Sequence, residues 1–373
     1  MIRHKKTLLL IVLFVAGLAF SGCVAGAGQT GWSGVAIADD TLFFGSMKGE
    51  LVALDLNGSS PWQPVPLEVP GSTGGAFGCT PPTTPVVLYG TPAVGEDLVY
   101  AGGYNGEIYA ITFDRGALRW VYPRQGNIGA PIVGGVIVSQ DKLYFSSANG
   151  NIYALDAETG DWSWTSQTGD KIWSTPAIDG DTLFIGSFDK KLYAIDTATG
   201  RERWPQPFVT QGPIVATPLV YDNTVYVGSF DRYFYAIDAS DGQMKWKSRQ
   251  AAEKWFWASP VAHNNTIYAP SSDGRVYVFD AESGERMDVI DLGSPISSSP
   301  LVVNDKVIVA TEEGKLYSID TASYQFKQLA NLEDKIYAPL SASDGLVYIH
   351  SQRGIIHEVD VQTGAKRQLY QIN

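Results

Sequence analysis

The sequence of 373 residues has little of what most enzyme sites are built from. It contains two cysteines, Cys23 and Cys79, and four histidines. The histidines do not recur at metal-ligand spacing such as HExxH, and there is no Gly-x-Ser-x-Gly elbow and no phosphate-binding P-loop. The sequence therefore predicts no catalytic residue, no metal site and no cofactor. A hydrolase that uses scattered carboxylates stays open, because such residues leave no spacing pattern.

Positive charge is also scarce. The chain has 27 Lys and Arg against 39 Asp and Glu, a net charge of −12. Such a surface repels phosphate backbones, so we expect no nucleic-acid partner. It would not adhere to anionic lipid by electrostatics either, which makes a covalent lipid anchor the more plausible attachment to a membrane.

Long hydrophobic runs are missing except at the N-terminus. There, MIRHKK precedes TLLLIVLFVAGLA, which has the charge and length of a signal peptide rather than of a membrane span. The run ends in Phe20-Ser21-Gly22-Cys23, which resembles a bacterial lipobox, with Phe20 in place of the usual Leu. We predict a signal peptide over 1–23, lipidation of Cys23, and a tether over 24–31. The alternative is ordinary secretory cleavage near Ala25 or Ala27. Both alternatives predict export, and the lipidated form would face the periplasm or the cell exterior.

What the chain does have is one short pattern repeated eight times. The clearest copies read DTLFIGSFDKKLYAIDTATGRERW and NTVYVGSFDRYFYAIDASDGQMKW. The same point of each copy falls at Asp55, Thr112, Asp156, Asp196, Asp238, Asp280, Asp320 and Asp360. These positions are 40 to 44 residues apart except for a first step of 57. Self-similarity at this period indicates stacked structural units that bury their faces against one another.

Each copy divides into four short runs rich in Val, Ile, Tyr and Phe, separated by turn residues such as Asp-Gly and Thr-Gly. Such runs are typical of strands joined by tight hairpins. Four strands in each of eight units predict an all-β, eight-bladed β-propeller over 32–373, which we expect to be a single domain and a monomer. The long first step predicts an insertion at about 56–88. It contains Cys79, which is either incidental to a tolerated loop or part of a partner-contacting flap or intermolecular thiol.

A further regularity follows the third run of several copies. Ala, then Asp two residues on, Gly four further and Trp four further recurs, and this resembles the tryptophan-docking pattern of pyrroloquinoline-quinone-type propellers. Asp can cap the following turn, Gly supplies a positive φ, and Trp can lie on a peptide plane of the neighbouring blade. We therefore expect structural roles for Trp120, Trp164, Trp204 and Trp246, and for Asp156, Asp196 and Asp238. The pattern decays near both ends, where Asp288 and Gln368 replace Trp and Tyr324 replaces Gly.

The resemblance implies a fold more firmly than an activity. The quinoprotein alcohol dehydrogenases with this fold hold their quinone between a Trp and a disulfide of adjacent cysteines, beside a calcium site and a catalytic Asp. This sequence has no adjacent cysteines.

Aromatic residues also recur just before the first strand of many copies. They are Trp32, Tyr89, Trp173, Trp257 and Tyr337. Matching positions in a ring of blades lie at one end of its central channel, so these side chains are predicted to form a broken aromatic collar. Charged residues precede it: Lys171, Glu253, Lys254, Asp334 and Lys335. The collar is either a partner-binding surface or a plug that packs on the next blade.

Three functions follow from these patterns. Eight repeats, a lipobox and missing redox residues resemble the BamB family, propeller lipoproteins of the outer-membrane β-barrel assembly machinery. That resemblance implies a non-enzymatic scaffold with a membrane-protein or envelope-complex partner, and Val24 after the cysteine is compatible with outer-membrane sorting. The alternatives are a divergent quinone-binding dehydrogenase or sensor, and a surface propeller that binds a polysaccharide or other ligand through the collar.

Overall fold

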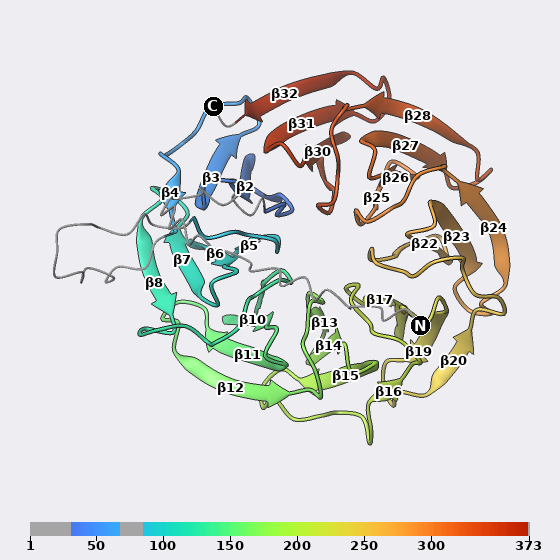
Figure 1. Ribbon diagram of the computed structural model, residues 1–373, viewed down its shortest axis with the longest axis horizontal. Helices are drawn as coiled ribbons and strands as arrows, with labels where there is room; N and C mark the ends of the chain where they lie inside the picture. The colour runs from blue at the N-terminus through green and yellow to red at the C-terminus, as the bar shows by residue number, and fades with distance from the viewer. Residues whose placement is uncertain (1–30, 68–84, 372–373) are drawn as a thin grey trace, which may run out of the picture.

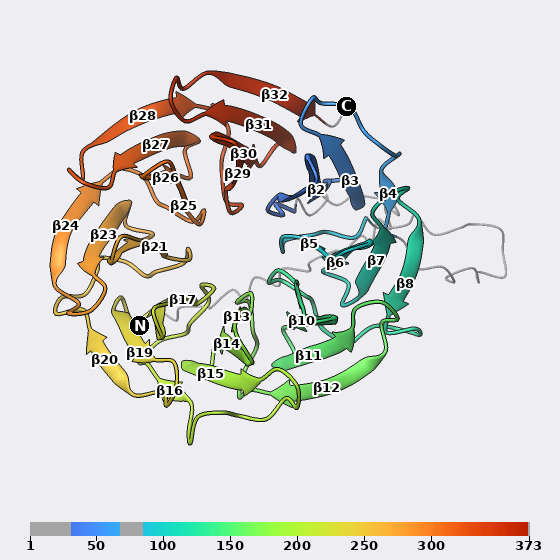
Figure 2. The same cartoon turned by 180° about the vertical axis from the view of Figure 1, so that it is seen from behind.

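Eight four-stranded antiparallel sheets stand around a central axis in the computed structural model, which describes residues 31–67 and 85–371 (Figures 1 and 2). In each sheet the four strands follow one another in chain order from the centre of the ring to its rim. The described residues form no helix, and so none that could cross a membrane. The prediction of an all-β, eight-bladed propeller is therefore confirmed.

The first four blades use consecutive strands. Blade 1 contains β1 (Ala36–Ala38), β2 (Thr41–Gly45), β3 (Glu50–Asp55) and β4 (Val65–Pro66), and blade 2 contains β5 (Ala93–Val94), β6 (Leu98–Gly102), β7 (Ile108–Thr112) and β8 (Leu118–Tyr122). Blade 3 contains β9 (Ile137–Ser139), β10 (Lys142–Ser146), β11 (Asn151–Asp156) and β12 (Trp162–Gln167), and blade 4 contains β13 (Ala177–Asp179), β14 (Thr182–Gly186), β15 (Lys191–Asp196) and β16 (Phe208–Val209).

The other four blades continue the same order. Blade 5 contains β17 (Leu219–Tyr221), β18 (Thr224–Gly228), β19 (Phe234–Asp238) and β20 (Met244–Lys247), and blade 6 contains β21 (Val261–His263), β22 (Thr266–Pro270), β23 (Arg275–Asp280) and β24 (Arg286–Asp291). Blade 7 contains β25 (Leu301–Val303), β26 (Lys306–Ala310), β27 (Lys315–Asp320) and β28 (Phe326–Asn331), and blade 8 contains β29 (Ser341–Ser343), β30 (Leu346–His350), β31 (Ile355–Asp360) and β32 (Lys366–Gln371).

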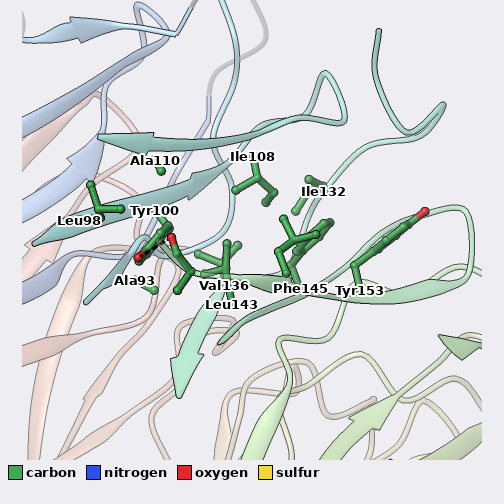
Figure 3. Packing of buried hydrophobic residues seen from close by; sticks show 12 residues of the cluster. Ala93, Leu98, Tyr100, Ile108, Ala110, Ile132, Val136, Leu143, Phe145 and Tyr153 are labelled. Atoms are coloured by element: carbon green, nitrogen blue, oxygen red, sulfur yellow. Dashed lines mark hydrogen bonds between the residues drawn. The ribbon is translucent and has the colours of Figure 1, made fainter. Parts of the chain in front are cut away.

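The hydrophobic pattern of each strand follows its place in the blade. The second and third strands are buried along nearly their whole length, because both faces of the sheet pack on neighbouring blades. The outer strands are largely exposed, as in β12. Figure 3 shows one interblade layer, in which Ile108 of blade 2 and Phe145 of blade 3 are both fully buried. Because every layer is shared between two blades, no blade has a complete core of its own.

The first hairpin of most blades is a two-residue loop. Ala38 pairs with Thr41, so only Asp39 and Asp40 connect β1 to β2. Both residues have positive φ, 44° and 59°, which a type I′ turn requires and which Asp and Asn tolerate best. This geometry explains why Asp and Asn fill the connection in so many copies.

Neighbouring blades are joined by an indole that crosses from one to the next. Trp164 Nε1 donates to the backbone oxygen of Thr197 at 2.9 Å, and the Tyr144 hydroxyl donates to the same oxygen at 3.2 Å. The Trp164 ring lies on Gly200, where a Cβ would meet it at 2.7 Å and where φ is +73°. Glycine is required there for both reasons. The same indole contact joins Trp120 to Ala157, Trp204 to Ala239 and Trp246 to Ala281.

The spacing pattern in the sequence did not identify a fifth docking tryptophan. Trp62 donates its N–H to the backbone oxygen of Phe113 at 3.1 Å, and its ring lies on Gly116. Its copy is one residue shorter between Asp55 and Trp62 than the others, so a fixed spacing misses it. The segment expected as an insertion at about 56–88 thus begins with the docking residue and fourth strand of blade 1. Residues 68–84, with Cys79, lie outside the described residues.

The repeated aspartates stand where the third strand of each blade ends. Asp156 Oδ1 accepts hydrogen bonds from the Thr159 backbone N–H at 2.8 Å and from its hydroxyl at 2.9 Å. Asp196 holds Thr199 in the same way, and Asp238 holds Ser240. The hydrogen bond from Thr199 is the main reason why the pKa of Asp196 is lowered. Each carboxylate thereby organises the turn into the outer strand.

The ring closes between complete blades, without exchange of a strand between the chain ends. By residue count Gln368 should occupy the tryptophan position of blade 8, and this expectation is wrong. The β-bulge of this blade falls between Ile356 and His357, so Arg367 pairs with Glu358 where the other blades pair Ala with Trp. Arg367 Nη2 donates to the backbone oxygen of Leu56 at 2.9 Å, the carbonyl position that indoles occupy elsewhere, and it pairs with Glu358 at 2.8 Å.

The closing seam differs from the other interfaces on its inner side as well. In blades 1, 2, 4 and 5 a glycine at the end of the second strand receives a large side chain from the next blade, as Gly228 receives Phe256. At the seam His350 stands at the end of the second strand instead. His350 is fully buried, and its Nδ1 lies 2.9 Å from the backbone oxygen of Ser33. The Ser341 hydroxyl also donates across the seam, to Val35.

The docking contact predicts that two tryptophans of one strand contribute very differently to the free energy of unfolding. Trp164 is 6 % exposed, whereas Trp162 on the opposite face of β12 is 60 % exposed. We expect Trp164→Ala to lower the free energy of unfolding by about 3–5 kcal/mol, and the control Trp162→Ala to change it by less than about 0.5 kcal/mol. Urea denaturation of both variants measures this difference. Equal losses would contradict the docking role.

The buried histidines predict that the folded propeller loses stability in acid. Burial lowers the pKa of His350 and of His357 to about 4, from an ordinary value of 6.5. The folded state thus keeps both rings neutral while the unfolded chain takes up protons below about pH 6.5. We expect stability to fall from about pH 6.5 toward pH 4, by on the order of 1–2 kcal/mol per histidine at pH 5.

Urea titrations at a series of pH values test this expectation. The double variant His350→Gln and His357→Gln keeps polar side chains but removes both titrating groups, so its stability should vary less with pH between 6.5 and 4.5. Carboxylates such as Asp196 contribute at lower pH in both proteins. The same slope for both proteins between pH 6.5 and 4.5 would disprove a histidine origin.

Candidate functional site: an aromatic channel mouth

One end of the central channel is ringed by the residues that lead into each innermost strand. A cavity of about 140 Å³ is lined by all five collar residues, Trp32, Tyr89, Trp173, Trp257 and Tyr337. The structure therefore brings together side chains that are up to 305 positions apart in the sequence. In blades 3, 5 and 7 the same position holds Val133, Val215 and Ser297, so the collar is broken by three smaller side chains.

In blades 2 to 8 the second residue after the end of the second strand is held near the collar by one backbone hydrogen bond. In blade 4 the Phe188 N–H donates to the Lys171 oxygen at 3.0 Å, where Phe188 follows the second strand and Lys171 precedes Trp173 by two residues. Blades 2 to 8 repeat this bond, from Tyr104 to Val87, Ala148 to Pro131, Phe188 to Lys171, Phe230 to Pro213, Ser272 to Trp255, Glu312 to Pro295 and Gln352 to Lys335. Each bond therefore ties the second hairpin of a blade to the loop before its collar position.

In blades 4 to 6 these positions form a continuous aromatic arc, defined as Trp173, Phe188, Phe230, Trp255 and Trp257. Ring centroids are 4.7 Å apart for Trp173 and Phe188, and 6.2 Å apart for Trp173 and Trp257. Phe230 lies 5.7 Å from Trp255 and 5.8 Å from Trp257. Edge-to-face and offset contacts of this kind fix each ring by its neighbours.

The Lys171 ammonium lies over the arc. It is 4.9 Å from the Trp173 ring centre and 4.4 Å from that of Phe188, within the range of a cation–π interaction. Part of the arc is thus already covered by a cation of the protein itself.

A second group of rings belongs to blades 8, 1 and 2. Trp32 lies 4.7 Å from Tyr89 and 5.2 Å from Tyr337, and Tyr89 lies 5.3 Å from Tyr104. Burial, with a smaller contribution from Tyr104, raises the pKa of Tyr89, so its hydroxyl stays a neutral hydrogen-bond donor. Trp32 is the central ring of this group.

Between the two aromatic groups lies a notch at blade 7. It is a cavity of about 520 Å³ whose lining residues are Trp32, Lys254, Trp255, Trp257, Ser272, Pro295, Ser297, Glu312, Tyr337 and Gln352. Blade 7 contributes only small or polar side chains, and its Glu312 accepts a short hydrogen bond from the Ser297 hydroxyl. The notch therefore has an aromatic wall on each side and a positioned carboxylate between them.

The charged residues expected beside the collar differ in where they lie and in which residues they contact. Only Lys254 lines the notch. Glu253 pairs instead with Arg275, and Asp334, only 9 % exposed, pairs with Arg353 at 3.3 Å. Tyr104, Phe188, Phe230 and Trp255 were missed in the sequence, although the repeated Gly-Ser-Phe of two copies marks one of these positions.

The channel mouth does not match a calcium-bound quinone of the dehydrogenase type. The sequence lacks adjacent cysteines, and within residues 31–67 and 85–371 no group of three or more His, Cys, Asp or Glu side chains is placed to hold a metal ion. The aromatic faces and hydrogen-bonding groups instead form a surface suited to binding.

The repeated indole contact and the eight blades define the class of protein, a tryptophan-docked eight-bladed β-propeller. The family is shown by a sequence match over nearly the whole chain. The protein-family model described as outer membrane protein assembly factor BamB matches residues 27–166 and 148–370. The chain belongs to that family.

Solved structures show the same fold. BamB from Moraxella catarrhalis has 21 % identity and a TM-score of 0.70, and the match covers 87 % of this chain and 92 % of that one. The computationally designed Ika8 protein has 15 % identity and a TM-score of 0.71, covering 89 % and 97 %. A europium-containing methanol dehydrogenase has 15 % identity and a TM-score of 0.66, covering 89 % and 82 %. No curated protein matches the chain.

Proposed function

We propose that this protein is a non-enzymatic, exported scaffold that binds a protein of the cell envelope and takes part in outer-membrane β-barrel assembly. The match of the BamB family model to almost the entire chain is the observation that carries this proposal. The channel mouth supports it, because a rigid cluster of large aromatic side chains is what protein interfaces use as an anchor.

The aromatic arc is the part of the mouth best suited to a protein partner. Trp255 and Trp257 are 44 % and 37 % exposed, which is unusual for tryptophan. Their neighbours hold the rings in place, so binding would cost little side-chain entropy. The outer strands at the rim offer a second mode of contact, since their free edges can pair with a strand of the partner.

A pull-down from solubilised envelopes tests the partner. We expect the tagged full chain to recover a β-barrel assembly protein, identified by mass spectrometry. The double variant Trp173→Ala and Phe188→Ala should lower recovery at least about tenfold, which corresponds to 1.4 kcal/mol. The control Trp162→Ala removes an exposed side chain but leaves the backbone edge of β12 unchanged, so recovery should not change. Recovery of no envelope protein by the wild type would refute the scaffold function.

The lipid anchor is a separate part of the proposal. Cys23 lies outside the described residues, so its role rests on the predicted lipobox alone. We expect Cys23→Ala to abolish incorporation of labelled fatty acid and to move the protein from the membrane fraction to the soluble fraction. The intact mass of the purified protein supplies a second readout. An unlipidated wild-type protein cleaved near Ala25 or Ala27 would show ordinary secretion instead.

A further inference from the structure

The notch at blade 7 has a composition that differs from the rest of the channel mouth. Trp255 and Trp257 of blade 6 form one wall, and Tyr337 of blade 8 with Trp32 of blade 1 forms the other. Blade 7 contributes Pro295, Ser297 and Glu312, and these smaller side chains leave space between the walls. A volume of about 520 Å³ falls within the range of small-molecule sites.

The walls are rigid and accessible. Trp255 and Trp257 both pack on Phe230, and the backbone oxygen of Trp255 accepts hydrogen bonds from the Ser272 N–H at 3.0 Å and the Ser271 hydroxyl at 3.3 Å. Flat, solvent-exposed aromatic faces held in this way attract groups with a partial positive charge, such as the C–H bonds on one face of a sugar ring.

The polar groups of the notch are also held in place. Ser297 donates to one carboxylate oxygen of Glu312, and the Glu312 N–H is bound to the Pro295 oxygen at 2.8 Å. Glu312 can therefore offer its second oxygen as an acceptor, beside the amide of Gln352 and the ammonium of Lys254. Such a set of donors and acceptors matches a ligand with several hydroxyl groups.

The charge of the notch argues for a neutral ligand. Its lining has one acid, Glu312, and one base, Lys254, and neither makes an ion pair with another residue of the described chain. The two charges cancel, so neither a cationic nor an anionic ligand gains from the site as a whole. A quaternary ammonium ligand, which aromatic walls alone would suit, is opposed by Lys254.

We propose that the notch binds a neutral saccharide, with the sugar ring against Trp255 and Trp257 and its hydroxyl groups on Glu312, Gln352 and Lys254. The notch shares Trp255 and Trp257 with the aromatic arc proposed for a protein partner, whereas the pull-down tests Trp173 and Phe188 at the other end of that arc. The two proposals fail separately, because the variants that test them do not overlap.

Titration of the purified full chain with neutral oligosaccharides tests the site. The probes are cellotetraose, maltotetraose and chitotetraose, and the readouts are calorimetry and tryptophan fluorescence. We expect saturable binding of at least one probe. Trp255→Ala combined with Trp257→Ala should weaken it at least about tenfold, and Glu312→Gln, which keeps the size of the side chain, by about tenfold. The control Trp162→Ala should change the affinity less than about twofold.

Three results would overturn the proposal. They are no saturable binding of any probe at millimolar concentration, binding that is unchanged in the double tryptophan variant, or binding at the notch of peptides but of none of the saccharides. Thermal unfolding of each variant separates loss of the site from loss of the fold. Glu312→Gln provides a further check, because a merely structural carboxylate would alter stability without altering affinity.

Discussion

The interfaces between blades depend on one backbone carbonyl oxygen, that of the residue directly after each third strand. In five of the eight interfaces an indole of the preceding blade donates to this oxygen and lies on a glycine of the same turn. A buried carbonyl without a partner is costly, and a large aromatic side chain buries much apolar surface. One side chain therefore satisfies the polar group and seals the layer between two blades. Because no blade buries both faces alone, the fold is stable only when these contacts extend around the ring.

The seam between blades 8 and 1 shows how the same requirement is met with other residues. Arg367 replaces the indole at the Leu56 oxygen, and Glu358 balances its charge. On the inner side, the buried ring of His350 lies against the backbone oxygen of Ser33. The first and last blades meet here, so this interface forms between the described segments that are most distant in sequence.

The interblade contacts and the channel mouth use different parts of the repeat. The docking tryptophans lie on the outer strands, whereas the channel mouth is formed by the loops before the innermost strands and by the second hairpins. None of the five docking hydrogen bonds involves a residue of the channel mouth. Hence the arc and the notch differ in composition while the strands of the blades remain alike. In the BamB family this division would allow one propeller to present several unlike surfaces at one end.

The repeat determined the architecture by itself: eight copies with strand-like runs specify eight blades, and the Ala-Asp-Gly-Trp spacing marks the interfaces, since these are local patterns set by the period of the chain. Equivalence between copies was enough to place Trp32, Tyr89, Trp173, Trp257 and Tyr337 on one channel. Sequence counting failed where a copy changes length or moves its bulge, as at Trp62 and Arg367. Only the tertiary structure decided that Phe188, Phe230 and Trp255 join the collar and that Glu312 lies in a notch between two aromatic walls. Those neighbours come from different blades, and their distances depend on how the ring closes, which no single repeat encodes.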